Sequence, residues 1–204
     1  LEADPGTVSL EALKAFKEAG VNRLSLGWQS TDDGLLKEIG RQHSVHENRL
    51  IFEQARQVGF ENLSVDFMFA LPGQSMDGLN KQLDEVIGLG PEHISLYALT
   101  YHEGTPFEDW RKSGKLIPIS DDIEARMMNQ IESRLEEAGY EHYEVSNYAK
   151  SGFRSKHNSS YWTGIPYLGI GSGANSFLRD ESNTGTRFES IRQPKDYVAY
   201  WGTT

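Results

Sequence analysis

The chain has 204 residues, a net charge of −10 and no cysteine. Its length allows one domain, or one and a half, with enough residues for a core. The acidic balance, without a lysine or arginine cluster, argues against nucleic acid as a partner. No apolar run approaches the roughly 20 residues of a membrane span, so we expect a cytoplasmic protein. The absence of cysteine excludes disulfides, thiolate zinc sites and cysteine-ligated iron–sulfur clusters within this chain, and we predict no metal site in it.

An amphipathic stretch, a glycine and a strand-like run recur four times. The copies read EAG-VNRLSLGWQ, QVG-FENLSVDFMF, GLG-PEHISLYALT and EAG-YEHYEVSNYA. Their glycines stand where a helix ends in a left-handed cap: Gly20, Gly59, Gly90 and Gly139. Helix-to-strand units in series predict parallel strands joined by helical crossovers, as in a TIM-like (β/α) barrel or a wound sheet. Active sites of such α/β folds lie at the carboxyl ends of the strands.

The predicted elements follow this repeat in chain order. Ser9 is expected to cap the first helix. Four helices have apolar residues at helical spacing, over residues 10–16, 50–58, 76–87 and 123–135. Three complete strands are expected, over residues 23–29, 63–69 and 94–100. The intervening stretches, including residues 30–43 and the EGTPF segment, are expected to be linkers.

The pattern changes near residue 140, where the chain becomes rich in aromatic residues and glycine. Strand-like runs without helices between them predict a small C-terminal α+β subdomain over residues 140–204. Residues 1–139 would then form the C-terminal part of a partial barrel. The opening letters LEADPG resemble the end of a strand, and residues 183–204 show weak periodicity. We therefore expect a piece of a longer protein, with the subdomain incomplete.

Polar side chains fall at the ends of the predicted strands. Glu2, Gln29, Asp66 and Thr100 supply two carboxylates, an amide and a hydroxyl to one rim. Carboxylates accept hydrogen bonds from hydroxyl and ammonium donors, so the set suits a ligand with ribose hydroxyls and an amino-acid moiety. One such residue alone most often begins a solvated loop, but four on successive strand ends favour a site.

Seven motifs, in order, resemble one known family. They are EADPGT, RLSLGWQS, IGRQH, VDFMFALPGQ, HISLYALTYHEGTPF, HNSSYW and YLGIGSGANSF. Together they look like the radical S-adenosylmethionine (SAM) family of oxygen-independent coproporphyrinogen III oxidases, and within it the branch of HemW-type heme chaperones. The resemblance covers nearly the whole chain and implies a radical SAM barrel.

The resemblance implies two sets of site residues. The SAM contacts would be Glu2, Gln29, Arg41 and Asp66, with Thr100 and Asn175 as weaker ones. The heme contacts would be His157, Asn158, Tyr161 and Trp162, which match an HNxxYW pattern associated with heme. A histidine nitrogen is a usual axial ligand of heme iron, and aromatic neighbours give a porphyrin apolar contact. Without the resemblance, the second set is more simply a hydrogen-bonded packing cluster.

The chain also departs from the family pattern. Trp28 replaces a small or branched aliphatic residue, and it would either crowd the SAM site or repack. Ala70 replaces a glycine, and Asn175 replaces a histidine, which weakens any chemistry assigned there. The other five histidines, including His93, are expected to be surface or packing residues.

The largest departure is the absence of the CxxxCxxC motif that holds the 4Fe-4S cluster in this family. Thiolates are needed to bind such a cluster, so we expect its ligands upstream of these residues, and this piece alone should not perform radical chemistry.

Three functions stay open at this point. The first is a chaperone that binds heme and delivers it to respiratory proteins, which HNSSYW favours. The second is an oxygen-independent coproporphyrinogen III oxidase, in which a SAM-derived radical abstracts hydrogen from propionate side chains before decarboxylation to vinyl groups. The third is a degenerate relative that keeps the scaffold and has lost the cluster.

Overall fold

The computed structural model describes residues 1–202. The chain forms two compact units, the first over Leu1–Arg154 and the second from Ser155 onward. Within the described residues, no helix is both long and apolar enough to cross a membrane.

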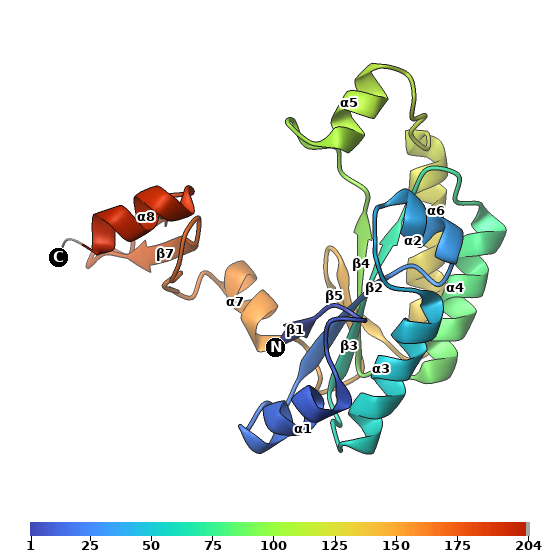
Figure 1. Cartoon of the computed structure of the whole chain (residues 1–204), viewed down its shortest axis with the longest axis horizontal. Helices are drawn as coiled ribbons and strands as arrows, with labels where there is room; N and C mark the ends of the chain where they lie inside the picture. Colours follow the sequence, from blue (N-terminus) through green and yellow to red (C-terminus); the bar gives the residue numbers. More distant parts are fainter. Residues whose placement is uncertain (203–204) are drawn as a thin grey trace. The chain divides into compact units, whose positions relative to one another are not determined.

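The first unit is built on a six-stranded sheet (Figure 1). Its strands are β1 (Glu2–Ala3), β2 (Leu24–Gln29), β3 (Leu63–Phe69), β4 (His93–Ala98), β5 (Glu141–Glu144) and β6 (Asn147–Ala149). They lie in the order β1-β2-β3-β4-β6-β5. Strands β1 to β4 are parallel neighbours, and β6 pairs antiparallel with both β4 and β5. The predicted parallel α/β sheet is confirmed, and over the residues described here it stays open.

The first unit has six helices: α1 (Leu10–Glu18), α2 (Asp33–Glu38), α3 (Val45–Gln57), α4 (Met76–Leu89), α5 (Pro106–Lys112) and α6 (Asp121–Glu137). Helices α1, α3, α4 and α6 contribute side chains to the core beside the sheet, whereas α5 stands apart from the sheet, beyond the end of β4 (Figure 1). Ser9 caps α1 as predicted, because its side chain accepts a hydrogen bond from the N–H of Ala12. The four repeat glycines all have left-handed backbone, with φ between 63° and 93°. They end α1, α3, α4 and α6 and turn the chain into the next strand, as expected.

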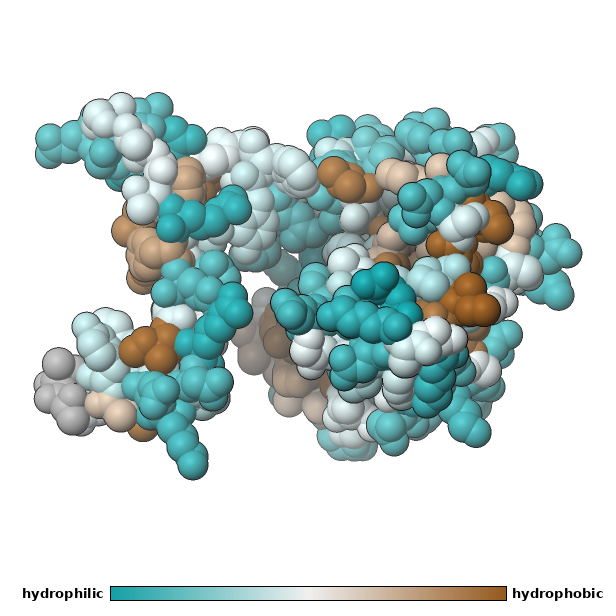
Figure 2. All heavy atoms as spheres, turned by 90° about the horizontal axis from the view of Figure 1, so that it is seen from above, coloured by the Kyte–Doolittle hydropathy of each residue, from teal (hydrophilic) through white to brown (hydrophobic). Residues whose placement is uncertain are grey.

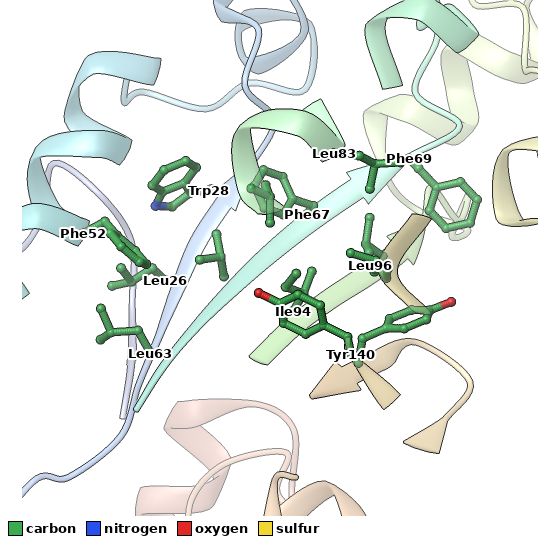
Figure 3. Packing of buried hydrophobic residues seen from close by; sticks show 14 of the residues in the cluster. Leu26, Trp28, Phe52, Leu63, Phe67, Phe69, Leu83, Ile94, Leu96 and Tyr140 are labelled. Atoms are coloured by element: carbon green, nitrogen blue, oxygen red, sulfur yellow. The ribbon is translucent and has the colours of Figure 1, made fainter. Parts of the chain in front are cut away.

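Alternation along the strands gives the sheet one apolar and one polar face. On β2, Leu24, Leu26 and Trp28 are fully buried in the core, so Ser25, Gly27 and Gln29 point the other way. Figure 3 shows Leu26, Trp28, Phe67 and Ile94 in one cluster beneath the helices. Trp28 packs edge to face against Phe52 and Phe67, with ring centroids 6.1 and 5.8 Å away. It therefore repacks into the core and does not crowd the polar face.

The division between the units differs from the boundary expected near residue 140. It falls between Arg154 and Ser155, because β5 and β6 join the main sheet and do not form a separate subdomain. The backbone register Ile94 to Tyr148 places the Tyr148 ring in the same core as Ile94.

The second unit contains α7 (Lys156–Thr163), β7 (Asn175–Arg179), β8 (Gly185–Glu189) and α8 (Pro194–Trp201). Strands β7 and β8 form a two-stranded antiparallel sheet, which gives this unit its predicted α+β character. Neither described helix has a buried residue. Apolar side chains reach the surface of this unit (Figure 2), among them Trp162, Leu168, Ile170 and Val198. A two-stranded sheet with so little buried apolar surface is marginally stable by itself.

Candidate functional site

A pocket of about 300 Å³ opens on the polar face of the sheet in the first unit. Its lining residues are Glu2, Ala3, Asp4, Ser25, Gly27, Gln29, Arg41 and Asp66. Four of the six residues expected to contact SAM, namely Glu2, Gln29, Arg41 and Asp66, are thus brought together in one pocket.

Three neighbouring strands and one loop supply these side chains. The backbone register pairs Glu2 of β1 with Ser25 of β2, and Ser25 with Ser64 of β3. Arg41 follows α2 and reaches Asp4, with Nη1 and Oδ1 3.2 Å apart. Asp66 is the fourth residue of β3, so the predicted position at a strand end is wrong. It reaches the pocket because period-two alternation turns it to the polar face.

Asp66 is a carboxylate at the floor of the pocket. The Ser25 hydroxyl lies 3.0 Å from each of its oxygens, and the Ser64 hydroxyl lies 3.4 Å from Oδ1. Burial raises the pKa of Asp66 above its usual value, and hydrogen bonds from Ser95 and Ser25 oppose that shift. The nearby charge of Glu2 raises it further. A partly buried carboxyl group with a perturbed pKa beside a pocket is typical of a functional site.

Gln29 has a strained backbone where β2 ends. Its φ of 62° lies in the left-handed region, which costs a residue with a side chain about 1–2 kcal/mol. The strand register shifts between Leu26 and Gln29, and this irregularity accompanies the turn of the chain. Such strain persists where the surrounding structure holds it, most often at ligand sites.

Gly27 leaves the space into which two of these side chains fit. A Cβ atom at this position would lie 2.8 Å from Asp4 Oδ1 and 2.9 Å from Gln29 Nε2. Only a residue without a side chain allows both groups to approach the strand so closely. Gly27 lies on the same face of β2 as Ser25 and Gln29. The alternation of residues along the strand is the sequence signal that could have identified Gly27 and Ser25. The role of Asp4 had no such signal, because its contact with Arg41 depends on the loop after α2.

The chemistry of this pocket fits SAM. Three carboxylates, from Glu2, Asp4 and Asp66, line the pocket together with one guanidinium, from Arg41, which pairs with Asp4. SAM carries an ammonium and two ribose hydroxyls, which donate hydrogen bonds to carboxylates, and a sulfonium, whose positive charge a carboxylate attracts. The 4Fe-4S cluster does not fit the chain in the same way, since there is no cysteine to ligate it. Within residues 1–202, no group of three or more His, Asp or Glu side chains is arranged to hold a metal ion.

Two residues expected near SAM lie outside this pocket. Strand β4 ends at Ala98, so Thr100 stands in the following loop, exposed, with its hydroxyl 3.5 Å from the Ala98 carbonyl. Asn175 is the exposed first residue of β7 in the second unit.

The four residues expected to contact heme lie on α7. Ser155 caps this helix by accepting from the N–H of Asn158. One turn apart, the Tyr161 hydroxyl lies 2.9 Å from His157 Nε2, and the two rings meet edge to face at 5.0 Å. Both side chains are exposed, and Trp162 next to Tyr161 is 62% exposed. The helix therefore presents an imidazole and two aromatic rings to its surroundings and does not bury them in a core.

Comparison with known proteins shows what the chain is similar to. The model of the radical SAM superfamily matches residues 1–86. The chain is 41% identical to the heme chaperone HemW of Bacillus subtilis, over 97% of the chain and 51% of that protein. It is 38% identical to the heme chaperone HemW of Haemophilus influenzae, with the same two shares. The chain thus spans about half the length of the curated relatives it matches.

Two solved structures share the fold of this chain. Coproporphyrinogen III oxidase (HemN) of Escherichia coli, a radical SAM enzyme, superposes with a TM-score of 0.76 at 21% identity. The match covers 98% of this chain and 48% of that one. The archaeal Elp3 of Methanocaldococcus infernus gives a TM-score of 0.55 at 23% identity, over 68% of this chain and 31% of that one. At these identities the likeness concerns the fold alone.

Proposed function

We propose that this chain is part of a HemW-like radical SAM protein that binds heme and delivers it, as a cytoplasmic chaperone, to respiratory proteins. The observation that carries the proposal is the 34–41% identity to heme chaperones from several bacteria, over at least 97% of the chain. A match of that extent includes residues from both units.

The exposed side chains of α7 support a heme contact in the second unit. His157 offers a nitrogen that can serve as an axial ligand of heme iron, and Trp162 and Tyr161 offer apolar surface for a porphyrin. In this structure, His157 Nε2 is already hydrogen-bonded to Tyr161. Iron would therefore replace the Tyr161 hydroxyl as the partner of that nitrogen, or bind after the ring turns.

The pocket on the polar face supports a SAM site in the first unit. Glu2 and Asp66 would accept from the ammonium or the ribose hydroxyls, Gln29 would both donate and accept, and Arg41 would hold the SAM carboxylate. SAM, together with a 4Fe-4S cluster held by cysteines outside this chain, supplies radical chemistry in this superfamily. The residues present here bind and orient the ligand. Thr100 and Asn175 stay predicted contacts without a place in this pocket.

The alternative is an oxygen-independent coproporphyrinogen III oxidase. The likeness to HemN, at 21% identity, favours the shared fold and not the shared reaction. The relatives with higher identity carry the name of the chaperone.

A transfer assay with the full-length protein tests the proposal. Heme-loaded protein is mixed with a heme-free respiratory cytochrome, and the appearance of the cytochrome spectrum is followed over time. In parallel, the protein is given coproporphyrinogen III, SAM and a reductant, and vinyl products are measured. The proposal expects transfer without decarboxylation. Decarboxylation without transfer would establish the oxidase instead.

A further inference from the structure

His93 links the pocket carboxylate to a tyrosine three strands away in the sheet order. It is the first residue of β4, fully buried, and the register places it beside Ser64 of β3. Its Nδ1 lies 2.8 Å from the Ser64 hydroxyl, and its Nε2 lies 2.7 Å from the hydroxyl of Tyr143 on β5. The Ser64 hydroxyl in turn lies 3.4 Å from Asp66 Oδ1.

The ring of His93 is neutral in this setting. Burial, with the nearby positive charge of Arg23 as a smaller cause, lowers its pKa to about 3. A neutral imidazole has one nitrogen that donates a hydrogen bond and one that accepts. The two hydroxyl groups on either side of His93 therefore cannot play the same role.

Only one direction of donation satisfies all three contacts when Asp66 is ionised. A carboxylate accepts only, so the Ser64 hydroxyl must donate its single hydrogen to Asp66. The Ser64 oxygen then accepts from His93 Nδ1–H, and Nε2 accepts from the Tyr143 hydroxyl. With the proton on Nε2, Nδ1 would take the hydrogen of Ser64 and Asp66 would lose this donor.

We propose that His93 is a positioning residue of the candidate SAM pocket: Tyr143 holds it as the Nδ1–H tautomer, and His93 directs the Ser64 hydroxyl onto Asp66. This inference rests on the proposed SAM site. Ser64 then donates to Oδ1 of the same carboxylate that the Ser25 hydroxyl contacts through both oxygens, and together they hold Asp66 in place.

Tyr143 is itself held at the sheet edge. The guanidinium of Arg154 lies 5.7 Å from the centre of its ring, and Arg154 pairs with Glu141 of the same strand at 3.0 Å. Arg154 is the last residue of the first unit, directly before the cap of α7.

A double-mutant cycle in the full-length protein with its cluster tests this role. SAM affinity is measured by titration calorimetry for Tyr143→Phe, Ser64→Ala and the double variant. We expect each single change to weaken SAM binding about 3- to 10-fold, and the double variant to be no weaker than Ser64→Ala, because both changes remove the same donor to Asp66. Tyr140→Phe is the matched control, since that buried tyrosine donates to the Pro91 carbonyl at 2.7 Å, away from the pocket.

Nitrogen NMR of the His93 ring gives a readout that a purely structural role would not change. The wild-type ring should show the Nδ1–H tautomer, and Tyr143→Phe should shift it toward a mixture. The proposal would be overturned if the double variant lost affinity by the product of the two single losses, since the two residues would then act independently. An Nε2–H tautomer in the wild type would also overturn it. Asp66→Asn distinguishes failure of the SAM site from failure of the role of His93. If Asp66→Asn binds SAM as wild type does, the SAM site itself is wrong. If Asp66→Asn loses SAM binding but Tyr143→Phe does not, only the role of His93 is wrong.

Discussion

Gly27 and Gln29 show how two residues of one strand shape the candidate SAM pocket. The strained φ of Gln29 turns the chain at the end of β2, and the missing side chain of Gly27 leaves room for Asp4 and Gln29. The sequence analysis found Gln29 from its position at a strand end. It did not find Gly27, because the close approach of two side chains depends on loops that the pattern of one strand does not describe.

Gly27→Ala should therefore weaken SAM binding at least tenfold while the fold is kept. The new Cβ would come too close to the ends of two flexible side chains, Asp4 and Gln29, which can move into the pocket, and it would be in ordinary contact with the Ala3 carbonyl oxygen at 3.9 Å. Calorimetric titration with SAM and thermal unfolding of the same samples measure both effects. Gly88→Ala is the control, because its new Cβ would meet nothing within 4 Å at an exposed position of α4. Equal affinities for Gly27→Ala and wild type would contradict this account of the pocket.

His93 should make the first unit sensitive to acid. Its folded pKa is about 3, below the ordinary 6.5, so the unfolded chain takes up a proton first as the pH falls. The stability that the neutral ring contributes is complete above pH 6.5 and is lost as the pH falls toward 3, by up to a few kcal/mol. Urea unfolding of wild type and His93→Gln across this range measures the difference. If the stability of both proteins fell equally steeply with pH, His93 would not be the cause of the acid sensitivity.

The regular elements were the most predictable part of the chain. The glycines after α1, α3, α4 and α6 marked the helix ends, because left-handed backbone is a local property. Helices α2 and α5 were taken for linkers, since their six and seven residues are too few to show a clear period. The pairing of β6 with β4 was also missed, because it joins residues about 50 positions apart and leaves no local signal.

Glu92 connects three of these elements and should be costly to remove. Its carboxylate accepts from the N–H of Leu63, at the start of β3, and from Arg56 of α3, both at 2.9 Å. Glu92→Ala leaves that N–H and a partly buried guanidinium without their acceptor, so we expect the free energy of unfolding to fall by about 2–3 kcal/mol. Exposed Glu61→Ala should change it by less than about 0.5 kcal/mol. Denaturant unfolding compares the two variants, and similar losses would refute the role of Glu92.

At the scale of the whole molecule, the chain has a candidate SAM pocket in one unit and an exposed aromatic helix in the other. Four of the six predicted SAM contacts share a pocket, since parallel strands bring their residues to one face. Thr100 and Asn175 do not, because β4 ends two residues earlier than expected and Asn175 belongs to the second unit. The heme assignment came from a motif, and spacing alone would not have distinguished α7 from a packing cluster.

Titration of the full-length protein with heme tests the central claim most directly. The Soret band is followed for wild type, His157→Ala and the control His46→Ala, which removes an exposed histidine of the first unit. We predict a saturable Soret shift for wild type and His46→Ala, and at least a tenfold weaker one for His157→Ala. The absence of a saturable shift in the wild type would contradict the heme-chaperone function, and an unchanged titration of His157→Ala would contradict the place of the heme on α7.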